Sequence, residues 1–237
     1  MSHDDHVVHD TDFERVRQNL DGLYGTVAAL QNAEIASRIV GTRVLDVGAG
    51  AGKLARDLSD QGFQVTAIDI DPRAVAFARE VTGVEVLPRS VYETGFPDRS
   101  FDAVVFRESV FHLDFERVLV EVERICGRQV VIFESNSPNP LLRLGRKLIG
   151  HEEHDERPPE YYAGALAAHG YVVTGPTYLD ACLIPLSGGL LTRPLPLAER
   201  ASGFLLRLDA AVTGVAARAG LDRTLCWRYL LSGVKAR

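Results

Sequence analysis

Residues 44–53 read Val44-Leu45-Asp46-Val47-Gly48-Ala49-Gly50-Ala51-Gly52-Lys53 and decide the fold. An apolar run typical of a buried strand enters a glycine-rich turn, and a helical pattern over 53–60 follows at once. Glycine has no Cβ, so such a turn lets a ligand approach the backbone, and the first N–H groups of the helix then face that ligand. The stretch therefore predicts a ligand-binding strand–turn–helix unit.

The spacing of the glycines separates the kinds of ligand that such a turn can hold. A phosphate-binding loop needs G-x-x-x-x-G-K-[ST], but Leu54 follows Lys53 and no glycine stands five positions before Gly52. A dinucleotide loop needs G-x-G-x-x-G, and Lys53 occupies its third glycine. Asp46 adds a carboxylate at the end of the strand, which repels a pyrophosphate and attracts a cationic ligand.

Strand and helix patterns alternate outward from this unit, which predicts right-handed crossovers. We expect an α/β fold with a doubly wound, mostly parallel seven-stranded sheet and helices on both faces. N-terminal helices and a helical insertion before the last strand are expected to form a cap. The expected segments are a terminal tail over 1–10, cap helices over 11–40, the core over 41–178, the insertion over 179–222 and the last strand within 223–237.

Composition excludes several classes of protein. The chain has 237 residues and a formal net charge of −6, and its 46% hydrophobic content is typical of a globular protein. The acidic balance argues against binding nucleic acid mainly through phosphates. Three isolated cysteines predict neither a zinc site nor a disulfide framework. With no signal peptide or apolar span in the sequence, a cytoplasmic protein without an integral membrane segment is expected.

Three further stretches complete a pattern. An acidic residue ends the second strand within Val65–Pro72, Phe96–Val105 carries P-D-R-S-F-D before the fourth strand, and a helix and strand follow over His112–Ile132. With 44–52, these stretches resemble the S-adenosylmethionine-dependent methyltransferases with the Rossmann-like fold (class I), small-molecule type. The resemblance covers about 43–134 and implies S-adenosyl-L-methionine as cofactor.

The resemblance also implies where that cofactor binds. Asp69 would accept hydrogen bonds from both ribose hydroxyls, and Ile70 would pack on the adenine. After the third strand, an acidic and a small residue are usual, whereas this chain has Ser90 and Val91 followed by Tyr92. The full set of expected cofactor-binding residues is Asp46, Gly48, Ala49, Gly50, Gly52, Asp69, Ile70, Ser90, Val91, Tyr92 and Arg107.

Candidate catalytic residues follow the fourth strand. His112 is the candidate base because its unperturbed pKa lies near neutrality; alternatively it caps a helix or contacts the cofactor. Glu108 would orient the substrate, or form a salt bridge to Arg107 instead. Candidate substrate residues are Tyr24, Asn136, His151 and His154.

Two features bear on the substrate. The run His151-Glu152-Glu153-His154-Asp155-Glu156 contains metal-ligand types, but a charged loop at the mouth of the site is favoured and no metal is expected. The apolar insertion suggests a hydrophobic acceptor, a homodimer interface or contact with a membrane surface, and packing onto the sheet is an equally good explanation.

The leading prediction is therefore an enzyme that moves the sulfonium methyl to a small, hydrophobic acceptor, with O-methylation favoured. N- or C-methylation of a natural product or lipid-like acceptor stays open. A nicotinamide-dependent oxidoreductase and a non-catalytic S-adenosylmethionine-binding module are the alternatives from other classes. A nucleic-acid substrate is disfavoured by the net charge and by Arg107-Glu108-Ser109-Val110, which stands where amino-methylating DNA enzymes carry N-P-P-Y.

Overall fold

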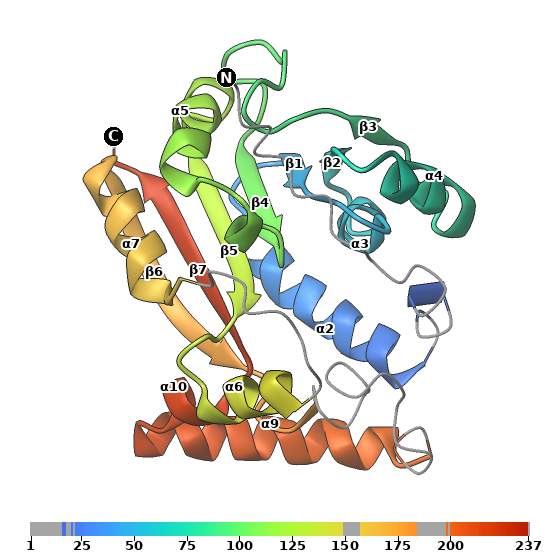
Figure 1. The fold of residues 1–237 in the computed structure, drawn as a ribbon, viewed down its shortest axis with the longest axis vertical. Coiled ribbons are helices and arrows are strands. Elements are labelled where there is room, and N and C mark those ends of the chain that lie inside the picture. The colour runs from blue at the N-terminus through green and yellow to red at the C-terminus, as the bar shows by residue number, and fades with distance from the viewer. Residues whose placement is uncertain are drawn as a thin grey trace.

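A computed structural model of the chain describes residues 16–17, 20, 22–148, 157–183, 198 and 200–236. Its strands are β1 (Arg43–Val47), β2 (Gln64–Asp69), β3 (Val86–Pro88), β4 (Ala103–Arg107), β5 (Gln129–Ser135), β6 (Tyr171–Leu179) and β7 (Arg228–Lys235). Within the described residues they form one sheet of seven strands in the order β3-β2-β1-β4-β5-β7-β6 (Figure 1). The predicted seven-stranded sheet is confirmed.

The direction of β7 shapes the functional edge of this sheet. The pairs among β3, β2, β1, β4 and β5 are parallel, whereas β7 runs antiparallel to both β5 and β6. The first residue of β7, Arg228, therefore lies opposite Ser135 at the end of β5. Ligands of open α/β sheets bind beyond the carboxyl ends of the strands, so the start of β7 joins the edge where a site is expected.

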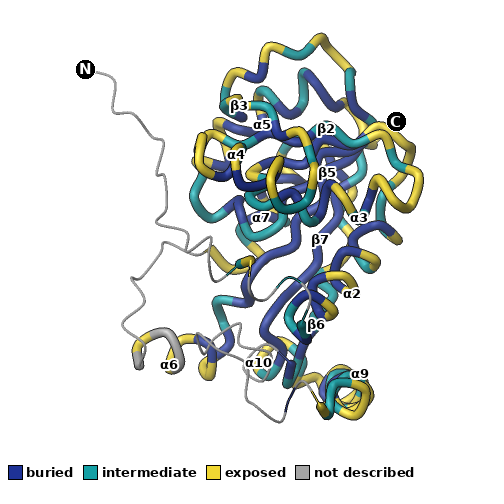
Figure 2. Tube along the Cα trace, turned by 90° about the vertical axis from the view of Figure 1, so that its right-hand side faces the viewer, coloured by how far each residue is buried: buried dark blue, intermediate teal, exposed yellow. Residues whose placement is uncertain are grey.

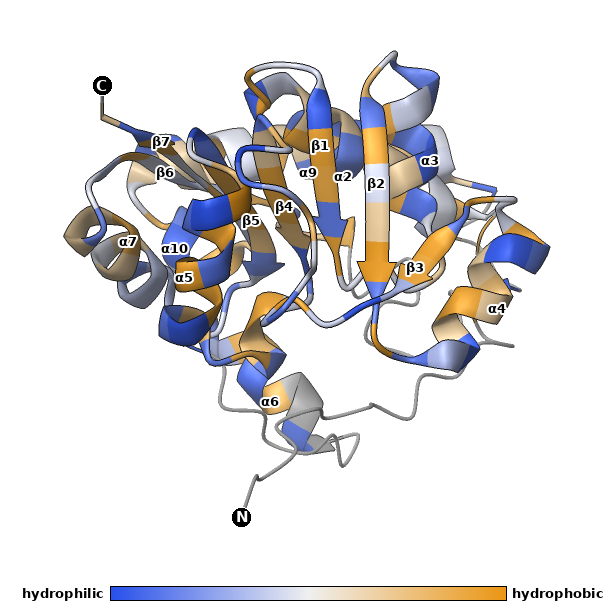
Figure 3. Cartoon of the chain, turned by 90° about the horizontal axis from the view of Figure 1, so that it is seen from above, coloured by the Kyte–Doolittle hydropathy of each residue, from blue (hydrophilic) through white to orange (hydrophobic). Residues whose placement is uncertain are grey.

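Helices cover both faces of the sheet, as predicted (Figure 3). Their bounds are α2 (Leu23–Arg38), α3 (Lys53–Asp60), α4 (Pro72–Val81), the 3₁₀ turn η1 (Val110–His112), α5 (Phe115–Ile125), α6 (Pro140–Leu148), α7 (Pro159–Ala168), α9 (Ser202–Ala219) and α10 (Asp222–Leu225). On one face, Phe115 of α5 stacks edge-on against Phe106 of β4 and Tyr162 of α7, with ring centroids 6.1 and 5.1 Å apart. On the other face, α2 and α3 pack on β4 and β5 through Ile35 and Leu58.

Local signals at helix starts behave as expected. Asp71 caps α4 by accepting a hydrogen bond from the backbone N–H of Arg73 at 2.8 Å, and Pro72 occupies the first helical position. Asp114 caps α5 in the same way, at 3.3 Å from the nitrogen of Arg117. These caps place the turns after β2 and β4 at the carboxyl edge of the sheet.

The expected cap differs in part from the structure. Within the predicted cap helices over 11–40, the part before α2 is described only at 16–17, 20 and 22, and α2 forms most of the remainder. The carboxyl half of α2 packs on the sheet, so α2 is a sheet-covering helix over that half and not solely a cap. Its amino half joins a separate apolar cluster beyond the strand ends, which consists of Leu23, Val27, Leu142, Leu183, Ala198 and Trp227.

The described part of the insertion divides into two faces. Leu183, Leu205 and Leu206 pack into the apolar cluster beside α2, whereas Phe204 and Leu208 of α9 are exposed. Figure 2 shows this division as a mainly exposed or half-buried α9 at the end of a deeply buried sheet. Packing therefore explains one side of the insertion and leaves the outer side of α9 facing solvent.

Candidate functional site

The glycine turn after β1 forms the centre of the candidate site. Gly48, Gly50 and Gly52 all have positive φ, and Gly52 directly precedes α3. A Cβ on Gly48 would lie 2.7 Å from Cβ of Ser109, so this position excludes any side chain. A Cβ on Gly50 would meet nothing within 4 Å. The turn is therefore packed against the protein at Gly48 and open to a ligand at Gly50.

Asp69 lies against the open side of this turn. Its Oδ2 accepts a hydrogen bond from the backbone N–H of Gly50 at 2.8 Å, and its Oδ1 accepts one from Asp71 at 2.9 Å. A carboxylate has about four acceptor positions, so both oxygens keep capacity for further donors. This arrangement fits a ligand with neighbouring hydroxyl groups, as the resemblance to the methyltransferases implies. Ile70, the predicted adenine contact, is exposed beside it.

Asp46 has a different environment from the one that the sequence suggests. It is buried in β1, with 1% of its surface exposed, and its Oδ2 has no hydrogen-bond partner in the structure. Burial raises the pKa of Asp46 to about 7, although the charge of Arg107 opposes the shift. Asp46 therefore lies beneath the turn as a buried acid with one unpartnered oxygen.

The predicted adenine-side residues are largely occupied within the protein. Val91 is buried in the core on the α5 face, so its side chain does not face a ligand. The hydroxyl of Tyr92 accepts a hydrogen bond from Asp114 at 2.9 Å, and the guanidinium of Arg117 lies 4.4 Å from the Tyr92 ring centroid. Ser90 accepts a hydrogen bond from the backbone N–H of Tyr92 at 3.3 Å. The side chain of Val91 therefore does not contact the cofactor directly, and only its backbone stays a predicted contact.

A network of buried charges joins the strand ends to α2. Arg107 donates to Oε1 of Gln31 at 2.8 Å, and Gln31 donates to Asp180 at 2.6 Å. Glu108 lies between two guanidinium groups, 3.5 Å from Arg107 and 2.5 Å from Arg228. We call these five residues the strand-end network: Gln31, Arg107, Glu108, Asp180 and Arg228. It ties together α2, the end of β4, the residue after β6 and the start of β7.

The strand-end network carries local backbone strain. Among the described non-glycine residues, only Arg99, Glu108 and Asp180 have positive φ, and two of them belong to this network. Burial lowers the pKa of the Arg228 guanidinium, but the charges of Glu108, Tyr24 and Asp180 outweigh that effect, so the pKa ends above its usual value. The backbone of Glu108 and of Asp180 is strained next to the buried Arg228, which indicates that the ion pairs fix the backbone here.

This network bears on the roles predicted for Glu108 and Arg107. The salt bridge between them is present, and Arg228 adds a second, shorter one to Glu108. Glu108 therefore forms the salt bridge to Arg107 that was expected as the alternative, and its role toward a substrate stays a prediction. Arg107 donates to Gln31 of α2, and its charge also acts on Asp46 beneath the glycine turn.

The other candidate residues are placed unequally. His112 ends η1 beside the carboxyl end of β4, half-buried, with its ring centroid 3.6 Å from that of Phe111. Tyr24 is half-buried on α2 near Arg228. Asn136 is fully buried, and its Nδ2 holds α10 by donating to the carbonyls of Arg223 and Cys226, while its role in substrate binding stays a prediction. His151 and His154 lie outside the described residues.

The sequence analysis missed four residues at this edge. Gln31, Asp180 and Arg228 belong to the strand-end network, and Ser109 donates from Oγ to the carbonyl of Val47 at 2.7 Å beneath the glycine turn. Ser109 lies two positions after the end of the buried strand β4, and a polar residue at that place was the available signal. For the other three, no local pattern marks the contact, because each partner is distant in sequence.

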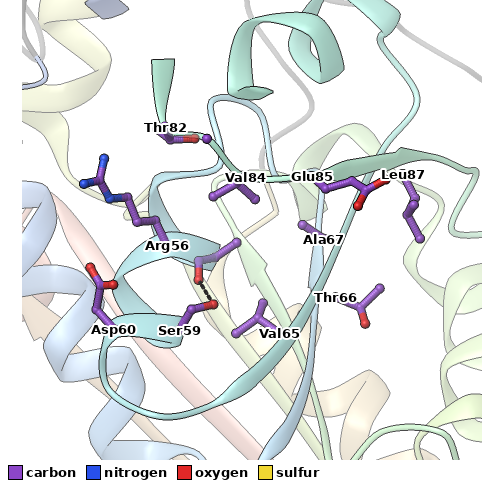
Figure 4. Close-up of a pocket in the computed structure, with 12 residues that line it drawn as sticks. Arg56, Ser59, Asp60, Val65, Thr66, Ala67, Thr82, Val84, Glu85 and Leu87 are labelled. Carbon is purple, nitrogen blue, oxygen red and sulfur yellow. Dashed lines mark hydrogen bonds between the residues drawn. The ribbon is translucent and has the colours of Figure 1, made fainter. Parts of the chain in front are cut away.

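A groove with a cavity volume of about 560 Å³ lies on another part of the sheet (Figure 4). Its walls come from α3, β2 and the segment before β3, with Arg56, Ser59, Thr66 and Glu85 among the lining residues. None of the predicted site residues lines it. The candidate site is therefore the glycine turn and not this groove.

One known protein family matches the part of the chain that contains the glycine turn. A family model described as "Methyltransferase domain" matches residues 45–133, from β1 to β5. The matched residues make up less than half of the 237-residue chain. The matched part holds the glycine turn, Asp69 and His112, whereas Gln31, Asp180 and Arg228 lie outside it.

Individual relatives match parts of the chain. The chain is 44% identical over 77 residues to a ubiquinone biosynthesis O-methyltransferase of Paramagnetospirillum magneticum, covering 31% of each chain. It is 32% identical over 152 residues to a demethylmenaquinone methyltransferase of Tropheryma whipplei, covering 56% of this chain and 62% of the relative. The chain thus spans about a third to three fifths of the length of these relatives.

Solved structures confirm the fold around the methyltransferase domain. A SAM-dependent methyltransferase from Archaeoglobus fulgidus has a TM-score of 0.68 at 15% identity, covering 95% of this chain and 100% of that one. Magnesium protoporphyrin IX methyltransferase from Synechocystis has a TM-score of 0.60 at 14% identity, covering 96% and 95%. The class I, Rossmann-like fold therefore extends well beyond residues 45–133.

Two kinds of feature are absent from the described residues: a group of side chains that could hold a metal ion, and a helix that could span a membrane. No group of three or more His, Cys, Asp or Glu side chains there is arranged to hold a metal ion. In the same part of the chain, no helix combines the length and hydropathy needed to cross a bilayer.

Proposed function

We propose that this protein is an S-adenosyl-L-methionine-dependent methyltransferase that acts on a small, hydrophobic acceptor, with oxygen as the methylated atom. The observation that carries the proposal is Asp69, which presents a two-oxygen acceptor beside the open glycine turn. The match of residues 45–133 to the methyltransferase domain model supports it. S-adenosylmethionine supplies an electrophilic methyl group on a sulfonium.

The residues at the turn would each make a different contribution to cofactor binding. Asp69 would hold the ribose hydroxyls, Gly50 leaves the space that the ligand needs, and the unpartnered oxygen of Asp46 offers a negative charge to a cation. A nicotinamide dinucleotide fits less well, because Lys53 replaces the third glycine and pairs with Asp57 at 2.6 Å at the start of α3. Methyl transfer needs an aligned nucleophile, and alignment alone can contribute about 7–11 kcal/mol to catalysis.

The acceptor is inferred from the apolar cluster beyond the strand ends. Leu23 and Val27 of α2, Leu183 and Trp227 give this end of the molecule an apolar interior. Relatives that match parts of the chain are named ubiquinone biosynthesis O-methyltransferase, magnesium-protoporphyrin O-methyltransferase and demethylmenaquinone methyltransferase, and the first two names specify oxygen as the methylated atom. A hydroxyl group is a weak nucleophile and needs a base.

Cofactor binding gives the first prediction. Isothermal titration calorimetry should show that the intact protein binds S-adenosylmethionine and its demethylated product, and binds NAD at least tenfold more weakly. Asp69→Ala should reduce the binding free energy by about 1.5–3 kcal/mol for each charged hydrogen bond lost. Asp60→Ala, at the exposed end of α3, is the matched control. Tighter binding of NAD than of S-adenosylmethionine would contradict the proposal.

The role of His112 gives the second prediction. We propose that its imidazole accepts the proton of the acceptor hydroxyl, because it ends η1 at the carboxyl end of β4. His112→Ala should lower turnover of a phenolic acceptor by about 100-fold and leave the dissociation constant of S-adenosylmethionine within threefold. His169→Ala is the control, since His169 pairs with Glu116 and Glu123 at the far end of the sheet. Unchanged turnover would remove His112 as the base.

A further inference from the structure

The outer face of α9 combines exposed apolar and basic side chains. Phe204, Leu208 and Val215 are exposed over 67%, 38% and 61% of their surfaces. At 100° per residue, these three positions fall within about 40° of one another on the helix. They form a single apolar stripe that faces away from the protein, and we call it the α9 stripe.

Charges on α9 are sorted by side. Arg207 and Arg218 are both exposed, and helical geometry places them within about 60° of Phe204 along one border of the α9 stripe. The single acidic residue of α9, Asp209, points inward, where its Oδ1 accepts hydrogen bonds from the backbone N–H groups of Cys182 and Leu183 at 2.6 and 2.9 Å. Among the described residues, neither arginine forms an ion pair. The outer face is therefore cationic.

The position of α9 makes this face accessible. The helix has 18 residues, about 27 Å in length at 1.5 Å per residue, and lies across one end of the molecule (Figure 1). Its inner side contacts α10, β6 and the apolar cluster, and its outer side is among the most exposed parts of the described chain (Figure 2). The helix is too polar to cross a bilayer.

We propose that the α9 stripe binds the surface of an anionic lipid bilayer, with α9 parallel to the membrane plane. An amphipathic helix with aromatic and leucine residues on one side and arginines at its border is suited to the boundary between headgroups and acyl chains. The whole chain has a net charge of −6, which an anionic membrane repels, so a local cationic face must direct the contact. Two copies meeting through the same face would instead bring four arginines together.

Lipid vesicles of defined composition test this proposal without using methyl transfer as the readout. The full chain should float with vesicles of equal phosphatidylglycerol and phosphatidylcholine, and bind at least tenfold more weakly to pure phosphatidylcholine. Raising the salt from 0.05 to about 0.5 M should also weaken binding, because the Debye length shortens severalfold. Failure of the intact protein to bind the anionic vesicles overturns the proposal.

Matched variants separate the two parts of the contact. Phe204→Ser with Leu208→Ser, and separately Arg207→Glu with Arg218→Glu, should each weaken vesicle binding about tenfold or more. Val120→Ser with Val172→Ser removes exposed apolar side chains from α5 and β6 and should leave binding unchanged. Because all these side chains are exposed, melting temperatures should stay within about 2 °C.

Two further measurements make the outcomes decisive. Calorimetry with S-adenosylmethionine should give the same affinity for the α9 variants and the parent protein, so a failure of the proposed function and a failure of membrane binding are distinguishable. Sedimentation equilibrium should show no change of mass on Phe204→Ser with Leu208→Ser. A dimer that this variant dissociates would assign the stripe to a second copy and overturn the membrane proposal.

Discussion

Glu108→Ala is expected to lower the free energy of unfolding by about 3–5 kcal/mol, because it leaves a buried guanidinium without its counter-ion. The side chain of Arg228 is only 10% exposed and lies 2.5 Å from the Glu108 carboxylate. Removing one partner of such a pair costs far more than the pair itself contributes, since the remaining charge stays desolvated. Urea unfolding monitored by circular dichroism measures the change.

A second substitution separates the charge from the shape. Glu108→Ala combined with Arg228→Met should recover at least half of the lost stability, because the buried guanidinium of Arg228 is then absent and Arg107 keeps its hydrogen bond to Gln31. Glu34→Ala is the matched control, since Glu34 forms an i,i+4 pair with Arg38 in which both side chains are about one-third exposed. That control should cost less than about 1 kcal/mol. A cost below about 1 kcal/mol for Glu108→Ala would show that the Glu108–Arg228 pair does not hold the strand end.

The stability result also bears on how the protein would use Glu108. If Glu108 holds Arg228 and Arg107, the Ala variant loses stability and S-adenosylmethionine affinity changes only through the fraction folded. A carboxylate that orients a substrate would instead be dispensable for folding. The distance of 2.5 Å to Arg228 and the positive φ of Glu108 favour the first behaviour.

The glycine turn and the capped helices could be predicted because their causes are local. Each of these signals lies within a few positions of the sequence. They are three glycines in five residues, Asp69 at the end of β2, and Asp71 followed by Pro72. The alternating strand and helix patterns then determine the order of crossovers, so the seven-stranded sheet follows from the sequence as well. Strand β6 reaches Leu179 because its pairing with β7 resumes beyond an irregularity at 174–177.

The strand-end network could not be predicted because its contacts join distant parts of the chain. Gln31 and Asp180 are 149 positions apart, and Arg228 meets Glu108 only because β7 inserts antiparallel between β5 and β6. The spacing of residues along the sequence does not reveal that β7 lies between β5 and β6. The burial of Asn136 and Val91 was missed for the same reason: the sequence places a residue after a strand but does not say which side chains the next elements cover.

Asp46 is expected to make the ligand-free protein lose stability as the pH rises from about 4 to about 7. Burial raises the pKa of Asp46 from 3.8 to about 7 in the folded state. Above pH 3.8 the unfolded chain releases this proton while the folded chain keeps it, so the unfolded state gains stability until the folded pKa is reached. At 1.36 kcal/mol per unit, the contribution is at most about 4 kcal/mol, and it is fully lost above pH 7.

The variant Asp46→Asn isolates this contribution from the other titrating groups. Several carboxylates, among them Asp71 and Asp102, have lowered pKa values and push stability in the opposite direction, so the pH dependence of the parent protein alone is not decisive. The difference in unfolding free energy between Asp46→Asn and the parent should grow in favour of the variant from pH 4 to pH 7.5, by up to about 4 kcal/mol. The same comparison for Asp60→Asn, whose side chain faces solvent, should be nearly flat. A flat difference for Asp46→Asn would mean that Asp46 is already ionised at neutral pH without any ligand, and that a cation at the glycine turn is not needed to compensate it.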